Sequence, residues 1–191
     1  MSKKAIVLLG EGFEEVEVIT PIDYLLRAGV EVTIAAVGLL NYVKGSHGIE
    51  LGANVSLESL AKEKKLSASA WDAVIVPGGM GGSLNIAASK EAGAFLKEMA
   101  GAGKLVCAIC AAPAKVLFPL GLLAGKKYTC YPGEEENVKD TTAMWKQDRV
   151  VIDGNLITSR AAGTAGEFAC AIIEKLVNGA EAKKLIERVL L

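Results

Sequence analysis

The chain has 191 residues, of which 51% are hydrophobic and 23% are charged, and its formal net charge is -1. This composition is typical of a soluble globular chain and argues against disorder, so we expect one domain over residues 1–191. The near-neutral charge gives no electrostatic basis for nucleic-acid binding. Because the sequence has no run of 18 apolar residues and no signal-peptide pattern at its start, we expect no membrane span and a cytoplasmic location.

Strand-like and helix-like segments alternate along the chain. Apolar runs predict strands at residues 5–9, 31–37, 72–76 and 105–109. Helical spacing predicts helices at residues 16–28, 56–65, 90–100, 164–177 and 180–190, and one more opening at Pro113. The remaining predictions are an antiparallel excursion at 43–55 and a hairpin within 150–157 that turns at Asp153-Gly154. This order predicts an α/β fold with a mostly parallel sheet and helices on both faces.

In such a fold, ligands bind beyond the carboxyl ends of the strands, here after Leu9, Val76 and Ile109. The first of these loops, residues 10–15, carries two of the three glycines of a dinucleotide fingerprint, but three carboxylates crowd the place of the pyrophosphate. We therefore expect no bound nucleotide. The second loop, residues 77–82, is either a platform of backbone N–H groups or a flexible connection.

The third loop contains Cys110, between a predicted strand and the helix expected at Pro113. A strand–nucleophile–helix turn lifts a side chain out of the sheet, and a helix N-terminus lowers the pKa of a thiol. The pattern is equally compatible with a buried structural cysteine. Cys107 spells a C-x-x-C pair with Cys110 but lies inside the strand, so we expect it in the core and pointing to the opposite face from Cys110.

Neither metal binding nor a histidine-dependent triad is favoured by the sequence. The four cysteines are expected to be reduced, and their spacing supports no zinc site. The one histidine, His47, lies far upstream of Cys110 in the predicted polar excursion. If Cys110 is a nucleophile, a group other than a same-chain histidine must therefore activate it.

Four segments resemble the ThiJ/PfpI superfamily, most closely its DJ-one branch, in the family's order and spacing. They are GFEEVEVITPIDYLLRAGVEVTIA, DAVIVPGGMGGSLN, CAICAAPAKVL and NLITSRAAGTAGEFA. The resemblance covers essentially the whole chain and implies a flavodoxin-like sandwich and a homodimer. The incomplete glycine fingerprint and the lack of metal-ligand clusters add the prediction that the protein needs no cofactor and no metal.

The resemblance also implies that Cys110 is a nucleophile and that Glu17, from the first helix, lies beside its thiol. Because two anions in contact ionise at a high cost, we expect a protonated Glu17 to donate to the thiolate and the pair to titrate as a unit. Glu14 and Glu15 are expected to serve the N-terminus of the helix. The oxyanion donors implied by the resemblance are the backbone N–H groups of Gly79 and Ala111.

Two positions depart from the family pattern. Tyr131, in the segment Thr129-Cys130-Tyr131-Pro132, takes the place of a histidine that many members carry near the nucleophile. Since a phenol is a weak base at neutral pH, we expect Tyr131 to contact substrate instead of acting as a general base. His47 takes the place of an arginine near the family's dimer interface and is expected to be a bystander.

Two functions follow from the resemblance. The first is a cysteine enzyme without cofactor that acts on small reactive dicarbonyls or glycated substrates, of the glyoxalase or deglycase type. The second is a redox-sensing stress protein or chaperone whose Cys110 is oxidised to sulfinic acid. Both need the same Cys110–Glu17 pair, so the sequence does not separate them, whereas the missing histidine disfavours a protease.

Overall fold

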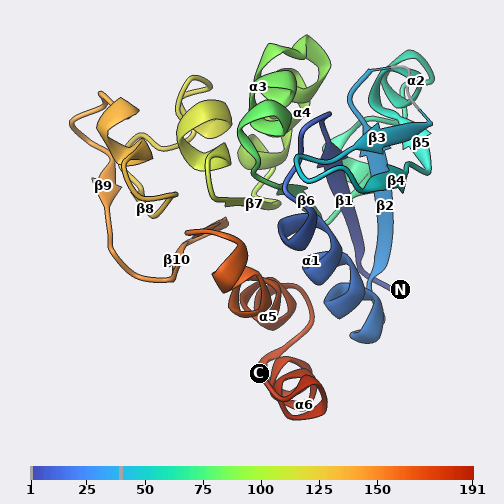
Figure 1. Ribbon diagram of the computed structural model, residues 1–191, viewed down its shortest axis with the longest axis vertical. Helices are drawn as coiled ribbons and strands as arrows, with labels where there is room; N and C mark the ends of the chain where they lie inside the picture. Colours follow the sequence, from blue (N-terminus) through green and yellow to red (C-terminus); the bar gives the residue numbers. More distant parts are fainter. Residues whose placement is uncertain (1, 39–40) are drawn as a thin grey trace.

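A mostly parallel sheet forms the centre of the molecule (Figure 1). The computed structural model describes residues 2–38 and 41–191. The strand order is β10-β11-β7-β6-β1-β2-β5, and every neighbouring pair is parallel except β10–β11. The strands are β1 (Lys4–Leu9), β2 (Glu31–Ala36), β5 (Val55–Ser56), β6 (Ala73–Val76), β7 (Leu105–Ile109), β10 (Val150–Asp153) and β11 (Leu156–Ser159). The predicted α/β fold class is confirmed.

Two short strand pairs lie outside the central sheet. The antiparallel pair of β3 (Tyr42–Lys44) and β4 (Glu50–Gly52) confirms the excursion predicted from the polar, glycine-rich sequence. The second pair, β8 (Lys127–Tyr128) with β9 (Met144–Trp145), is parallel and was not predicted, because two-residue strands leave no periodic pattern. The hairpin predicted within residues 150–157 is confirmed. Its turn is Gly154-Asn155, because Asp153 still belongs to β10, and Gly154 has a φ of 63°.

Helices cover both faces of the sheet. The α-helices are α1 (Glu15–Arg27), α2 (Leu57–Lys62), α3 (Met80–Ala88), α4 (Lys90–Gly101), α5 (Ala165–Leu176) and α6 (Gly179–Val189). The shorter helical segments are the 3-10 turns η1 (Ala68–Ala70), η3 (Glu134–Asn137) and η4 (Ala162–Thr164) and the π-helical η2 (Pro113–Leu117). As Figure 1 shows, α1, α5 and α6 lie together on one side, whereas α3 and α4 lie on the other.

Alternating side chains of β1 pack into two separate apolar cores, one on each face of the sheet. Ala5, Val7 and Leu9 pack in the core beneath α1, α5 and α6. Ile6 and Leu8 pack in the second core, under α2 to α4 and η2. A strand buried on both faces therefore reads as an unbroken apolar run, as the sequence does here.

Helix α3 begins within residues 77–82, which the sequence allowed to be either a platform of backbone N–H groups or a flexible connection. Gly79, at a φ of 79°, is its N-cap, and Gly81 and Gly82 lie in its first turn. A Cβ on Gly82 would lie 2.8 Å from Phe13 Cα, so only glycine allows the helix to approach the β1–α1 loop this closely. The segment is therefore an ordered start of a helix.

Helix α2 ends earlier than predicted. Its N-cap is Ser56, as expected, and accepts a hydrogen bond from the Ser59 N–H at 3.1 Å. The helix stops at Lys62, because Lys64 adopts the left-handed conformation with a φ of 56°.

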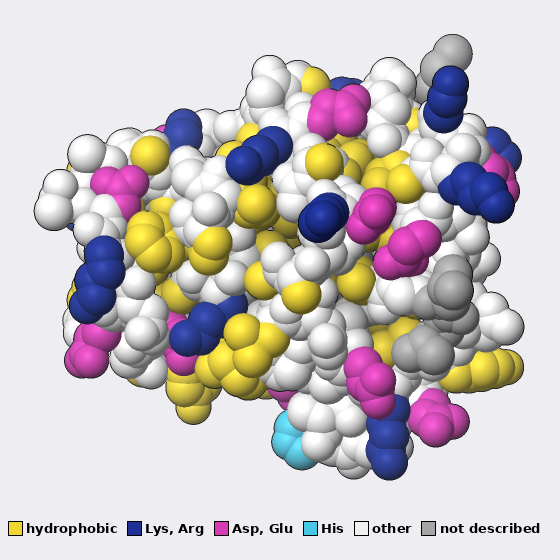
Figure 2. All heavy atoms as spheres, turned by 90° about the horizontal axis from the view of Figure 1, so that it is seen from above, with side chains coloured by type: hydrophobic (Ala, Val, Ile, Leu, Met, Phe, Trp, Pro, Cys, Tyr) yellow, Lys and Arg dark blue, Asp and Glu magenta, His cyan; other side chains and the backbone are white. Residues whose placement is uncertain are grey.

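Charges of both signs are interspersed with small clusters of hydrophobic side chains on the face that Figure 2 presents. In the described ranges 2–38 and 41–191, no helix has both the length and the apolar character needed to cross a bilayer.

Candidate active site

The carboxyl ends of β1, β6 and β7 are neighbours in the sheet, so the three predicted loops meet at one edge. Cys110 directly follows β7 and has a φ of 65°. Its N–H donates to the Ser159 carbonyl at 3.0 Å, and its own carbonyl accepts from the Tyr131 N–H at 2.8 Å. A non-glycine residue in the left-handed region carries strain, which these two bonds hold in place. The geometry is that of a nucleophile elbow.

Glu17 reaches this elbow from the first turn of α1. Its side chain is 1% exposed, and Oε2 accepts a 2.9 Å hydrogen bond from the Gly78 N–H. A Cβ on Gly78 would overlap both Glu17 Oε2 and Cys110 Cβ, so the absence of a side chain there lets acid and cysteine approach each other. Gly78, which sequence reasoning did not single out, is signalled by the Pro77-Gly78-Gly79 sequence after a buried strand.

Burial dominates the ionisation of the acid. Desolvation raises the pKa of Glu17 from 4.5 to about 7, while the Cys110 thiol and the backbone N–H groups of Gly78 and Ala162 lower it in part. No donor within the described residues reaches Glu17 Oε1 with hydrogen-bond geometry. A carboxyl with a pKa near neutrality can gain and lose a proton during turnover.

The pKa of the Cys110 thiol differs from the lowering expected at a helix N-terminus. Desolvation and the negative charge of Glu17 raise the pKa of Cys110 to about 12, whereas the Gly79 and Ala111 backbone N–H groups lower it. The expected lowering is therefore wrong while Glu17 is ionised, because burial and a neighbouring anion outweigh the backbone donors. Since each group raises the cost of charging the other, the two titrate together, and a proton on Glu17 removes the charge that opposes the thiolate.

The structure brings Cys110, Glu17, Gly79 and Ala111 together, which is the arrangement that the family resemblance implied. Tyr131 lies beside them through its backbone bond to Cys110, and its side chain is half-exposed. Cys107 is fully buried, as expected, but Cys110 packs against the same core as Cys107. The prediction of opposite faces is wrong because Cys110 lies past the strand, where side chains no longer alternate.

The two carboxylates next to Glu17 have different roles. Glu14 caps α1, as expected, and accepts a 2.9 Å hydrogen bond from the Glu17 N–H. Glu15 is buried and instead holds the β3–β4 turn: it accepts from the His47 N–H at 2.7 Å and pairs with His47 Nδ1 at 2.8 Å. Desolvation raises the pKa of Glu15, but the bonds from His47 outweigh it and bring the value to about 2.

Glu14, Glu15 and His47 are also the one group of possible metal ligands among the described residues, with ligand atoms within 4.8 Å of one another. The Glu15 oxygens already accept hydrogen bonds from the turn, and the group does not include Cys110. These contacts explain the cluster as the attachment of the β3–β4 turn to α1.

Comparison with known proteins assigns the chain to a family. The model of the DJ-1/PfpI family matches residues 3–175 of the chain. The chain belongs to the DJ-1/PfpI family. Within this family it is 41% identical over 176 residues to the protein dj-1beta of Drosophila melanogaster, covering 92% of this chain and 90% of that protein. It spans only 44% and 37% of two Arabidopsis thaliana relatives, the DJ-1 homologs A and B.

Two further DJ-1/PfpI members inform the function. A Caenorhabditis elegans relative, called glutathione-independent glyoxalase DJR-1.2, is 34% identical over 186 residues, with 97% of this chain and 95% of that protein covered. The structure of oxidized Toxoplasma gondii DJ-1 superposes with a TM-score of 0.91 at 34% identity, covering 99% of this chain and 98% of that one. The flavodoxin-like fold implied by the sequence resemblance is confirmed.

Proposed function

We propose that the protein is a cysteine enzyme without cofactor that acts on small reactive dicarbonyls or early glycation adducts. The observation that carries this proposal is the contact of Cys110 with Glu17 around Gly78, beside the Gly79 and Ala111 amides. The thiol is only partly exposed, which favours a small substrate. The relative called a glutathione-independent glyoxalase supports the same class of reaction.

With methylglyoxal, the Cys110 sulfur adds to the aldehyde carbon, and Glu17 gives its proton to the new alkoxide, forming a hemithioacetal. The N–H groups of Gly79 and Ala111 stabilise the oxyanion as it develops. The Glu17 carboxylate then removes the proton from the former aldehyde carbon, which gives an enediol once the ketone oxygen is protonated. Return of a proton to the neighbouring carbon and loss of the hydroxyl proton from the first carbon give the thioester. Water hydrolyses the thioester to lactate and regenerates the thiol, so the sum is methylglyoxal plus water to lactate.

Lactate formation from methylglyoxal by the purified protein tests this proposal. We expect turnover in the wild type and none in Cys110→Ser, because the serine hydroxyl is a far weaker nucleophile than a thiolate at neutral pH. Cys170→Ser is the matched control, since Cys170 is a buried thiol on α5 and should leave turnover unchanged. Wild-type protein that forms no lactate would refute the proposal.

The alternative is a redox-sensing stress protein or chaperone without a dedicated substrate, and the similarity to an oxidized DJ-1 supports it. Here the Cys110 sulfur takes one oxygen atom from each of two peroxide molecules, which are reduced to water, and becomes a sulfinic acid. Mass spectrometry after peroxide treatment would detect two added oxygen atoms on Cys110. Oxidation of Cys110 in a protein that forms no lactate would favour this function over the enzyme.

We also propose that the protein is a cytoplasmic homodimer. Helix α1 exposes Val16, Ile19 and Leu26, at 46%, 44% and 54% of their surface. An apolar helix face of this kind is typical of a surface that a partner covers.

A further inference from the structure

The last residue of β11, Ser159, holds the backbone of the elbow. It lies opposite Ile109 in the parallel pairing of β11 with β7, and its carbonyl accepts from the Cys110 N–H at 3.0 Å. The strained conformation of Cys110 is therefore fixed from the β11 side.

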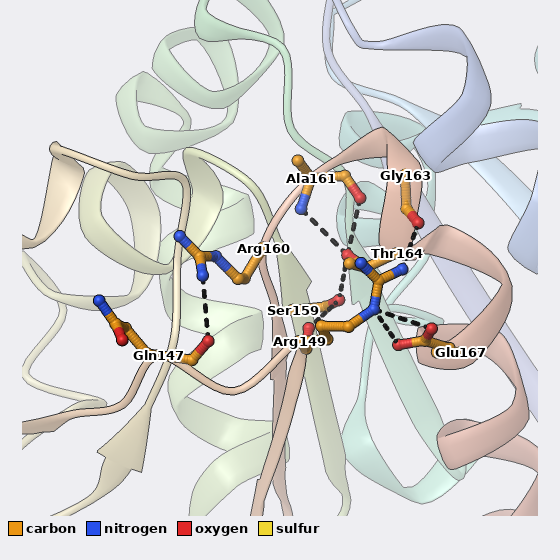
Figure 3. A network of polar contacts seen from close by, with 8 residues as sticks. All are labelled: Gln147, Arg149, Ser159, Arg160, Ala161, Gly163, Thr164 and Glu167. Carbon is orange, nitrogen blue, oxygen red and sulfur yellow. Dashed lines mark hydrogen bonds and ion pairs between the residues drawn. The ribbon is translucent and has the colours of Figure 1, made fainter.

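The side chain of the same residue holds a turn. Ser159 Oγ lies 2.7 Å from Thr164 Oγ1, and both residues are buried, at 0% and 5% exposure (Figure 3). Thr164 Oγ1 also accepts from the Ala161 N–H at 3.1 Å and lies 2.8 Å from the Ala161 carbonyl. Ser159 Oγ donates to the Arg149 carbonyl at 2.8 Å. The two hydroxyls have two protons for three oxygen contacts. With Ser159 donating to the Arg149 carbonyl, Thr164 therefore donates either to Ser159 Oγ or to the Ala161 carbonyl.

The turn that this network holds lies near the acid of the active site. The backbone N–H of Ala162, the first residue of η4, is close enough to lower the pKa of Glu17, but it makes no hydrogen bond to Glu17 Oε1. On its outer side the turn is held by Arg149, whose guanidinium donates to the Gly163 carbonyl at 2.7 Å and to the Glu167 carboxylate (Figure 3). The turn is thus fixed on both sides.

We propose that Ser159 and Thr164 are positioning residues that set how Cys110 and Glu17 share their proton. Ser159 holds the cysteine through its backbone carbonyl, and the hydroxyls of Ser159 and Thr164 hold the turn that carries the Ala162 amide. Small displacements of the acid relative to the thiol change the rate of proton transfer strongly. A single network that holds both sides therefore fixes the position of Glu17 relative to Cys110. The inference deepens the proposed function, since the same pair carries out the proposed chemistry.

The test uses the rate of Cys110 alkylation by iodoacetamide as a function of pH, measured in Thr164→Val, which has nearly the same shape but no hydroxyl. Because the Ala162 amide lowers the pKa of Glu17, a displaced turn should move the midpoint of the alkylation profile at least half a pH unit upward. Thr164→Ser, which restores the hydroxyl, should return the midpoint to the wild-type value. Lactate formation should fall at least tenfold in kcat in Thr164→Val, with KM within about twofold.

Thr142→Val is the matched control, since it removes an exposed threonine hydroxyl bonded to Asp140 and should change neither profile nor turnover. A folded Thr164→Val with the wild-type alkylation profile would overturn the inference. If Thr164→Val does not fold, the profile of Ser159→Ala decides in the same way. Alkylation needs no dicarbonyl, so a wild type without turnover would refute the proposed function while the profiles still test the positioning role.

Discussion

Gly78 donates its backbone N–H to Glu17 Oε2 at 2.9 Å and leaves the space that a Cβ would take from Glu17 and Cys110. Gly78 thus orients the Glu17 carboxyl and leaves room for Cys110 beside it. Because a methyl group at this position would overlap both partners, Gly78→Ala should push the acid and cysteine apart.

We expect Gly78→Ala to reduce lactate formation by at least a hundredfold, a loss comparable to that of a proton-transfer group. The variant should also unfold more easily, by roughly 1–3 kcal/mol, since the added methyl overpacks a buried site. Gly101→Ala, in α4 with open space around it, is the matched control and should retain full activity. Near-normal turnover in Gly78→Ala would show that the contact between Glu17 and Cys110 is not needed for catalysis.

Glu17→Gln keeps the side-chain shape but loses the mobile proton, and Glu17→Asp withdraws the acid by one methylene. Both should lower methylglyoxal turnover by roughly 10²–10⁴-fold. Alkylation of Cys110 should be at least as fast in Glu17→Gln as in the wild type, because the carboxylate that opposes the thiolate is gone. Glu11→Gln, at an exposed carboxylate of the β1–α1 loop, is the control. Wild-type turnover in Glu17→Gln would remove this residue from the mechanism.

The raised pKa of Glu17 also has a consequence for stability. The unfolded chain loses this proton near pH 4.5 and the folded chain near pH 7, so between these values the folded state binds more protons and the free energy of unfolding falls as pH rises. Glu17→Gln has no such charge to bury. We expect it to be more stable than the wild type by about 1–3 kcal/mol at pH 8, with a smaller difference at pH 4. Urea unfolding at both pH values measures this, and a less stable variant at pH 8 would contradict it.

The pair of His47 with Glu15 should stabilise the fold in a defined pH window. The pKa of Glu15 falls from 4.5 to about 2, so its contribution is present above pH 4.5 and is lost as pH falls toward 2. Hydrogen bonding to Glu15 raises the pKa of His47 above 6.5, so that contribution is present below pH 6.5 and is lost as pH rises through the raised value. His47→Gln should therefore lower the urea midpoint most between pH 4.5 and 6.5 and least at pH 9. An equal loss at every pH would show that the charge on the imidazole does not matter.

The exposed apolar face of α1 predicts a homodimer. Light scattering at micromolar concentration should give about twice the chain mass of 19.9 kDa. Ile19→Lys, at a residue 44% exposed, should shift the protein toward monomer without unfolding it, because charge is costly only in a covered interface. A monomeric wild type would contradict the prediction.

The sequence by itself determined the local features of this protein. Apolar runs identified β1, β6 and β7, because strands buried on both faces must be apolar throughout. The Cys110 elbow followed from a strand, a cysteine and a proline in that order. The pairing of Glu17 with Cys110 came from family resemblance, since no local pattern distinguishes Glu17 from Glu14 or Glu15.

Only the tertiary structure decided the ionisation and the support of the site. Glu17 and Glu15 are both buried carboxylates, yet one pKa rises and the other falls, because Glu17 meets a thiol and few donors whereas Glu15 meets the β3–β4 turn. The Ser159–Thr164 network reaches Cys110 only after β11 has paired with β7, because the Ser159 carbonyl accepts from the Cys110 N–H. Desolvation and hydrogen bonding depend on what packs around a side chain, and residues far away in sequence supply those neighbours.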